Sequence, residues 1–316
     1  MVDQYLGRMC PGHLIAKTLR MITVENLTKH YGGFAAVDDI SFVAEPGKVT
    51  GFLGPNGAGK STTMRMMVGL TPPTSGTTTV LGVPYGALNN PGVQVGVLLD
   101  ASAQHAGRTG REVLTLGAEV MGLPRQRVDE MLELVALTDR ADARTENLSG
   151  GQKQRLSIAC SLVHDPELVF LDEPSSGLDP QARRNLWDLL RSINEDGRTV
   201  VLTTHFMDEA ERLCDRVAII DHGRILATDT PAGFVRGLDA PTHISVAPGV
   251  VTEPDAAALP GVESVGNEGE SLTLSTRQPA RVLTALAERD ALDGLAVRGA
   301  TLEDVFLELT GREYRA

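Results

Sequence analysis

The stretch GPNGAGKST, residues 54 to 62, decides the fold of this chain of 316 residues. It matches the pattern G-x-x-x-x-G-K-[ST] from Gly54 to Ser61, follows an apolar segment typical of a strand, and runs into helix-forming residues. Gly57 and Gly59 allow the backbone to turn several N–H groups toward one anion at the start of that helix. The stretch therefore predicts a phosphate-binding loop between a strand and a helix.

The side chains of this loop match the same chemistry. Lys60 brings a positive charge to the β- and γ-phosphates of a nucleotide, the Ser61 hydroxyl suits Mg²⁺, and Thr62 adds a phosphate contact. A glycine-rich turn that matches the pattern by chance is the alternative, and the strand-to-helix context argues against it. The residues expected at the nucleotide are Gly54, Pro55, Asn56, Gly57, Ala58, Gly59, Lys60, Ser61 and Thr62.

Two adjacent acids end a second apolar segment, LVFLDEP, residues 168 to 174. Successive side chains of a strand point to opposite faces, so we assign Asp172 to a metal ion and Glu173 to the attacking water. A solvated strand end is the alternative. His205 ends the segment VLTTH, where ligands of open α/β sheets gather, and we expect it to contact the γ-phosphate or hold that water. A single histidine is more often structural, so this role depends on the other motifs.

Segments typical of strands and helices alternate from Met21 to about residue 224, and several strands are apolar almost throughout. This pattern predicts an α/β domain with a parallel core sheet over residues 21–236. Helical spacing of apolar residues predicts an inserted helical subdomain at about residues 100–164. A boundary is expected near residues 237–242, because acids outnumber bases by 12 to 6 in the segment that follows.

The last segment, residues 241–316, is expected to form a small α+β domain whose role is packing or dimerisation. SLTLST alternates like a strand, and Thr301 with Asp304 forms a variant capping box at the start of a helix. One face of that helix is expected to carry Leu302, Val305, Phe306 and Leu309. Residues 1–20 have two open interpretations: a disordered leader, or a misassigned start with Met21 as the first residue.

Composition narrows the partners and the compartment. The net charge of −12 argues against nucleic-acid binding, which relies on Lys and Arg. Three cysteines are too few and too scattered for a disulfide framework or a metal-binding pair, which favours a reducing cytosol. No segment approaches the roughly 18 apolar residues of a membrane-spanning helix, and no signal peptide is recognisable. We expect a soluble chain without a nucleic-acid partner.

The segment LSGGQKQR, residues 148 to 155, makes the chain resemble the ATP-binding subunits of ABC transporters over about residues 22–235. The resemblance implies the P-loop NTPase fold of the ABC type, with ATP and Mg²⁺ as its ligands. It implies that Tyr31 stacks on adenine and that Asp179, in SGLDP, lies in the loop that joins two subunits. The serine, glycines and glutamine of the signature, Ser149, Gly150, Gly151 and Gln152, would face the γ-phosphate held by the other subunit.

One phosphate loop and one signature in the chain therefore imply a head-to-tail dimer with two ATP molecules between its copies. The ending TLEDVFLELTG resembles the exporter ATPases related to daunorubicin and doxorubicin resistance proteins, which pair with separate membrane subunits. This resemblance implies drug or antibiotic efflux, a permease that grips a groove beside the helical subdomain, and a place on the cytoplasmic face of the membrane. A soluble ABC ATPase of translation or DNA maintenance is the alternative. Those proteins usually carry two ATPase halves, long coiled coils or zinc sites, which this chain lacks.

The segment VGVLLDAS, residues 95 to 102, ends a strand on Asp100 where the family pattern has a glutamine. In the family that glutamine reaches Mg²⁺ and faces the membrane partner. A carboxylate also supplies an oxygen to Mg²⁺ and adds negative charge near the γ-phosphate. We expect Asp100 to act as a metal ligand that keeps the metal-sensing role and makes closure of the site more dependent on Mg²⁺. The alternative is a solvated side chain away from the nucleotide.

Overall fold

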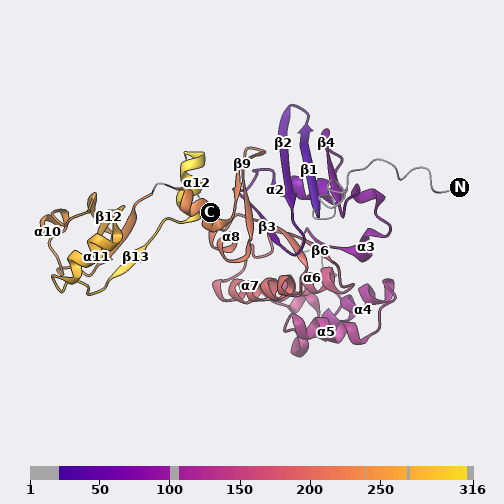
Figure 1. Ribbon diagram of the computed structural model, residues 1–316. Coiled ribbons are helices and arrows are strands. Elements are labelled where there is room, and N and C mark those ends of the chain that lie inside the picture. Colours follow the sequence, from indigo (N-terminus) through magenta and orange to yellow (C-terminus); the bar gives the residue numbers. More distant parts are fainter. Residues whose placement is uncertain (1–20, 100–106, 239, 269–270, 312–316) are drawn as a thin grey trace, which may run out of the picture. The chain divides into compact units, whose positions relative to one another are not determined.

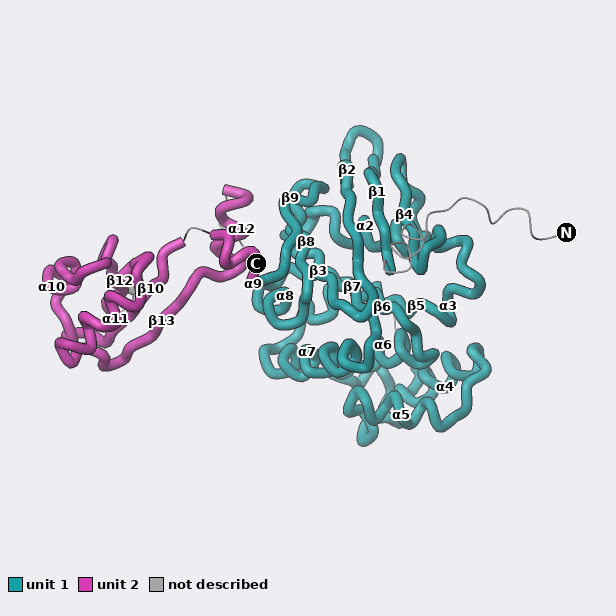
Figure 2. The backbone as a smooth tube through the Cα atoms, viewed as in Figure 1, with its two compact units in different colours: residues 1–231, 315–316 teal, residues 232–314 magenta. Residues whose placement is uncertain are grey.

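The structure is a computed structural model, and it describes residues 21–99, 107–238, 240–268 and 271–311. The chain divides into two compact units between Pro231 and Ala232 (Figure 2). The composition change near residues 237–242 lies a few residues beyond this division.

The centre of unit 1 is a six-stranded sheet in the order β5-β6-β7-β3-β8-β9 (Figure 1). All neighbouring pairs are parallel except β8 and β9, which form an antiparallel pair. Parallel strands covered on both faces are mostly apolar, and every residue of β3 and β7 is buried, their threonines included. The predicted parallel core is confirmed. The strands are β3 (Val49–Leu53), β5 (Val95–Leu98), β6 (Leu168–Asp172), β7 (Thr199–Thr204), β8 (Arg216–Asp221) and β9 (Arg224–Asp229).

A second, antiparallel sheet of unit 1 has the order β2-β1-β4, with β1 (Ile22–Tyr31), β2 (Phe34–Ala44) and β4 (Ser75–Val80). Its buried side chains share one core cluster with the parallel sheet and with α2 (Lys60–Met67). Phe42 of β2 meets Phe52 of β3 edge to face, with ring centroids 4.7 Å apart. The sequence pattern did not separate this sheet from the parallel one.

The helices α4 (Gly110–Val120), α5 (Gln126–Leu134) and α6 (Gly150–Leu162) gather at the end of unit 1 away from β1, β2 and β4 (Figure 1). They lie within the stretch where the helical subdomain was expected. Thr109 begins α4 with a capping box, in which its hydroxyl accepts from Glu112 N–H and the Glu112 carboxylate accepts from Thr109 N–H. Two short helical turns, η2 (Thr138–Arg140) and η3 (Thr145–Asn147), lie between α5 and α6, whereas η1 (Tyr85–Ala87) and α3 (Pro91–Gln94) lie between β4 and β5.

The remaining helices of unit 1 follow strands of the parallel sheet. They are α7 (Pro180–Glu195) after β6 and α8 (Met207–Leu213) after β7, while α9 (Pro231–Gly237) spans the division between the units. No helix among the described residues has the length and apolar character needed to cross a membrane.

Unit 2 contains a four-stranded antiparallel sheet in the order β11-β12-β10-β13 with two helices inserted in the pattern β-α-β-β-α-β. This is the split β-α-β, ferredoxin-like order, so the expected α+β character is confirmed. One face of the sheet packs on the helices in a cluster centred on Ile244, Leu274 and Leu286. The elements are β10 (Thr242–Val246), α10 (Glu253–Ala257), β11 (Ser264–Glu268), β12 (Ser271–Thr276), α11 (Pro279–Ala287) and β13 (Ala296–Arg298).

The last helix, α12 (Leu302–Thr310), begins with the expected capping box, because Thr301 N–H and the Thr301 hydroxyl both donate to Asp304. Leu302, Val305 and Phe306 are buried. Leu309, which is expected on the same face, is 41% exposed. Position 309 is seven residues beyond Leu302 and lies in the last turn of the helix, where side chains are the most accessible.

Candidate functional site

The loop between β3 and α2 has a backbone that only glycine permits at its closest approach. Gly59 has φ +102°, and a Cβ atom there would lie 2.5 Å from the carbonyl oxygen of Ala36. Gly54 N–H donates to the Thr204 carbonyl over 3.2 Å, which fixes the start of the loop at the end of β7. Gly59 precedes the first residue of α2, and no side chain caps that helix. The N–H groups at its start are therefore available to an anion.

Lys60 is the first residue of α2, and only 3% of it is exposed. Its ammonium group donates to the carbonyl oxygens of Gly54 over 2.7 Å and Pro55 over 3.0 Å, and it pairs with Glu173 Oε1 at 3.2 Å. These contacts occupy its three donors. Burial lowers the pKa of Lys60, whereas Glu173 and Asp172 act in the opposite direction. A buried ammonium held by loop carbonyls is well placed to exchange them for phosphate oxygens.

The acids that end β6 have separate partners. Asp172 Oδ1 accepts a hydrogen bond of 2.9 Å from the Ser61 hydroxyl and a second from the Thr203 hydroxyl. Glu173 has φ +46°, a left-handed conformation that is uncommon for a residue other than glycine. Its N–H donates to both oxygens of Thr203. This backbone turn directs the two carboxylates to different places.

Glu173 also pairs with His205, whose Nδ1 lies 3.2 Å from Glu173 Oε2. The His205 hydrogen bond, followed by the charge of Lys60, lowers the pKa of Glu173 to about 2, although partial burial acts in the opposite direction. Glu173 is therefore ionised and engaged on both oxygens in the unliganded protein. A carboxylate held in this way is a weak base until one of its partners moves away.

A cavity of about 340 Å³ joins the loop to β1 and β2. Tyr31 and Phe34 line it and are 53% and 64% exposed, so their rings are accessible to a planar ligand. Phe34 was not predicted from the sequence, although its place three residues after Tyr31 in a hairpin was a usable signal. The residues that line the cavity are Tyr31, Phe34, Ala36, Asn56, Gly57, Gly59, Lys60, Ser61, Thr62 and Glu173. Of the other predicted residues, Gly54 and Pro55 hold Lys60, and buried Ala58 accepts from Gly223 N–H.

The signature residues do not line this cavity. Ser149 caps α6 in a full capping box, since its hydroxyl accepts from Gln152 N–H and its own N–H donates to Gln152 Oε1. A Cβ at Gly150 would meet open space, whereas one at Gly151 would lie 3.1 Å from the Cβ of Ala182. Asp179 caps α7 by accepting from Gln181 N–H and Ala182 N–H. These residues thus begin two helices elsewhere in unit 1.

Comparison with known proteins decides the family. A family model described as ABC transporter matches residues 37–176. The chain is 39% identical to "Nod factor export ATP-binding protein I" of Sinorhizobium fredii, with 98% of this chain and 94% of that protein covered. The protein of the same name from Ralstonia nicotianae is 41% identical, with 96% and 98% covered. The chain belongs to the family of ABC transporter ATP-binding subunits.

Solved structures agree with this ABC ATPase fold. A subunit of the cbiONQ ABC transporter complex of Clostridium perfringens has a TM-score of 0.63 and 30% identity, covering 69% of this chain and 94% of that one. An ATP-binding cassette solved as a dimer bound to ADP and Pi has a TM-score of 0.60 and 25% identity, covering 66% and 98%. The predicted P-loop fold of the ABC type is confirmed, and this ABC ATPase binds and hydrolyses ATP.

Asp100, which was predicted from the sequence as a metal ligand, lies outside the described residues. Thr203 and Thr204 contribute to the site of this ABC ATPase, although sequence reasoning did not select them. The two adjacent threonines directly before His205 in VLTTH are the sequence feature that could have indicated them.

Gly59→Ala is expected to weaken ATP binding at least tenfold, because the added Cβ lies within 3 Å of a backbone oxygen and φ is positive. Isothermal titration calorimetry with ATP in the absence of Mg²⁺ measures the effect. Gly86→Ala is the matched control, since its Cβ enters open space without a positive φ. Equal affinity of Gly59→Ala and Gly86→Ala would show that the loop conformation does not govern nucleotide binding.

The depressed pKa of Glu173 predicts a pH-dependent contribution to the stability of the unliganded protein. Folding lowers this pKa from 4.5 to about 2, so the stabilisation is complete above pH 4.5 and is lost as the pH falls toward 2. Glu173→Gln lacks this ionisation, and the difference in free energy of unfolding between wild type and variant should shrink over that range. Urea unfolding at a series of pH values measures it. A constant difference would mean that Glu173 is not held by His205 and Lys60.

Proposed function

We propose that this ABC ATPase is the energy-supplying subunit of an exporter and drives transport by a separate membrane subunit. The observation that supports this proposal is the similarity of nearly the whole chain to two proteins named for Nod factor export, at 39% and 41% identity. This similarity includes unit 2 as well as the ATPase unit. It favours export over the soluble roles in translation or DNA maintenance.

For the nucleotide, we propose that the adenine ring stacks on Tyr31 and Phe34 and that the phosphates contact the N–H groups at the start of α2. The uncapped helix start, the open space at Gly57 and the accessible rings support this placement. Lys60 would leave Glu173 and the loop carbonyls for the β- and γ-phosphates. That exchange keeps the buried ammonium compensated throughout.

The metal is proposed to be Mg²⁺, held by Ser61 and Asp172. Their oxygens lie 2.9 Å apart, and hydroxyl and carboxylate oxygens are the ligands that Mg²⁺ prefers. The described residues contain no group of three or more His, Cys, Asp or Glu side chains that could hold a metal. The nucleotide phosphates are therefore expected to supply further ligands. Bound Mg²⁺ would neutralise charge that develops on the phosphate oxygens.

Glu173 is proposed as the residue that orients and deprotonates the attacking water. When Lys60 turns to the phosphates, Glu173 loses one cationic partner, and its pKa rises from about 2 toward the ordinary range. Its basicity therefore increases only in the loaded site. His205, 3.2 Å from Glu173, is proposed to hold the same water or the γ-phosphate.

The functional form is proposed to be a head-to-tail dimer. Ser149, Gly150 and Gly151 begin α6 away from the cavity that contains Lys60, so a second copy is needed to bring a signature to each phosphate loop. The related cassette solved as a dimer with ADP and Pi supports such a pairing. Asp179, which caps α7, would lie in the loop between the copies.

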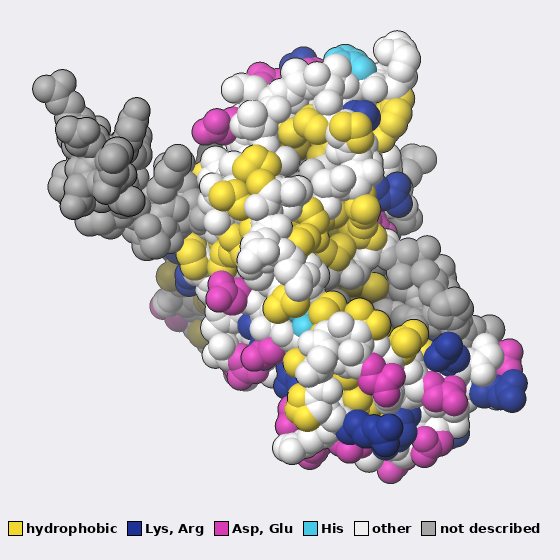
Figure 3. Space-filling model, turned by 90° about the vertical axis from the view of Figure 1, so that its right-hand side faces the viewer, with side chains coloured by type: hydrophobic (Ala, Val, Ile, Leu, Met, Phe, Trp, Pro, Cys, Tyr) yellow, Lys and Arg dark blue, Asp and Glu magenta, His cyan; other side chains and the backbone are white. Residues whose placement is uncertain are grey.

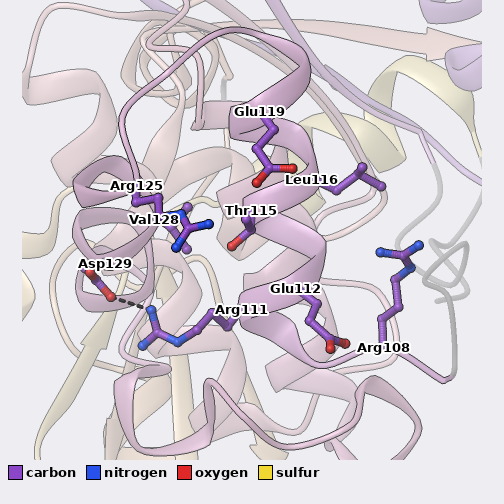
Figure 4. A pocket seen from close by; sticks show the side chains of 9 residues that line it. All are labelled: Arg108, Arg111, Glu112, Thr115, Leu116, Glu119, Arg125, Val128 and Asp129. Carbon is purple, nitrogen blue, oxygen red and sulfur yellow. Dashed lines mark hydrogen bonds and ion pairs between the residues drawn. The ribbon is translucent and has the colours of Figure 1, made fainter.

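A cavity of about 480 Å³ opens between α4 and α5 (Figure 4). Arg111 and Asp129 line this cavity and form an ion pair over 2.5 Å. Leu116 also lines the cavity and is 45% exposed. Figure 3 shows hydrophobic side chains exposed on this side of unit 1, next to a lobe with many charged groups. We propose that a cytosolic helix of the membrane subunit binds here, which would place the ATPase on the cytoplasmic face of the membrane.

Two observations suggest different classes of cargo. The ending TLEDVFLELTG resembles exporters of daunorubicin and doxorubicin, whereas the similar curated proteins are named for Nod factor export. The full-length similarity is the stronger support, so Nod factor is the first cargo to test and an antibiotic of the anthracycline type the second.

Co-expression with the membrane protein encoded beside this chain tests the proposal. We expect the two proteins to co-purify and, in inverted vesicles, to accumulate one of the two cargo classes only with ATP and Mg²⁺. Lys60→Ala should keep the complex but lose transport, because ATP binding weakens. A well-folded chain that forms no complex and supports no transport would refute the exporter assignment.

A further inference from the structure

Glu209, in the first turn of α8, is an acid whose side chain is fully buried. Acidic side chains are almost never fully buried unless they have a partner. The partner here is Trp187 of α7, whose indole Nε1 donates to Glu209 Oε1 over 2.9 Å. Trp187 is itself 5% exposed and is the only tryptophan of the chain. This pair joins α7 to α8, and neither helix contributes a residue to the cavity that contains Lys60.

The other polar neighbours of Glu209 belong to the catalytic segments. Burial raises the pKa of Glu209, and hydrogen bonding from Thr204, Ser175 and Trp187 acts against it. Thr204 directly precedes His205, and Ser175 lies two residues after Glu173. Within the described part of the chain, Oε2 of Glu209 and the Ser175 hydroxyl are both buried without a hydrogen bond of full geometry.

A second contact joins the same helix to the same segment. The Arg183 guanidinium of α7 lies 3.8 Å from the ring centroid of Phe206, and that ring lies 4.0 Å from the ring of His205. Arg183 and Trp187 are four residues apart, so they project from one side of α7. This side of α7 thus contacts the segment that carries His205 at two points.

Core packing alone does not explain this arrangement. An apolar residue at position 209 would fill the space without the cost of burying a carboxyl group. The acid instead accepts from α7, and its remaining polar neighbours lie next to His205 and Glu173. Asp179 caps the start of α7. A displacement of this helix would reach Glu209 through its hydrogen bond with Trp187.

We propose that Glu209, paired with Trp187, is a positioning residue that holds His205 in place relative to Glu173 and links this placement to α7. The proposal rests on the proposed function, because Asp179 and α7 would then meet the second copy. Docking of the copies would move α7, and Trp187 with Glu209 would adjust His205. The pair thus makes hydrolysis dependent on the dimer.

Four variants of the full chain test this pair: Trp187→Phe, Glu209→Ala, Glu209→Gln and the control Ser192→Ala. Ser192, also on α7, donates to the Leu189 carbonyl over 2.8 Å, so its variant removes one hydrogen bond of the helix away from the catalytic segment. Trp187→Phe and Glu209→Ala should lower kcat by roughly tenfold or more with KM for ATP nearly unchanged, because misplacement of a catalytic group affects the chemical step. Glu209→Gln keeps an acceptor for the indole and should retain most of the rate, as should Ser192→Ala.

The fluorescence of Trp187 gives a readout that is independent of turnover. In the wild type, addition of ATP without Mg²⁺ should change its emission in a saturable way, and Glu209→Ala should lose this change. A Trp187→Phe variant with wild-type kcat, or a Glu209→Gln variant as slow as Glu209→Ala, would overturn the positioning role. Absence of hydrolysis in the wild type itself would instead refute the proposed function.

Discussion

A buried lysine is the constraint on which the rest of the site depends. Lys60 is 3% exposed, and an ammonium group removed from water must be compensated by acceptors or by an opposite charge. In the unliganded protein the compensation comes from two loop carbonyls and Glu173. Any ligand that enters must replace these partners, and a nucleotide phosphate does so with more negative charge. In the proposed mechanism, the contact between Lys60 and Glu173 therefore selects the ligand and restrains Glu173.

The parallel sheet places this lysine and its partners together. The carboxyl ends of β3, β6 and β7 meet at one edge, where they carry the loop, the two acids and His205. Thr203 connects two of these ends, because its hydroxyl donates to Asp172 and accepts from Glu173 N–H. Behind this edge, Trp187 and Glu209 join α7 to the His205 segment. The site thus lies where the ends of three strands meet, and α7 contacts the segment after β7 through Trp187.

Much of this arrangement could be predicted from the sequence because it depends on local patterns. The glycines of GPNGAGKST specify their own backbone and chemistry, so the placement of the loop followed from them. The alternation of apolar strand segments with helical segments predicted the parallel core. The β2-β1-β4 sheet and the Trp187–Glu209 pair depend on contacts between distant segments, which no local period records. Leu309 satisfied the helical period and is still exposed, since burial at a helix end depends on what packs there. The partners of Lys60 were likewise not predicted, because a motif specifies its ligand and not the contacts made without it.

The central claim is that Glu173 restrains Lys60 in the unliganded protein and acts as the base once ATP has drawn Lys60 away. The most direct test is a measurement of ATP affinity and single-turnover hydrolysis for Glu173→Gln beside the wild type. We expect Glu173→Gln to bind ATP as tightly as the wild type or more tightly, because the neutral side chain competes less for Lys60. We also expect this variant to lose turnover and to trap a dimer. Hydrolysis near the wild-type rate, or loss of ATP binding with the fold intact, would contradict it.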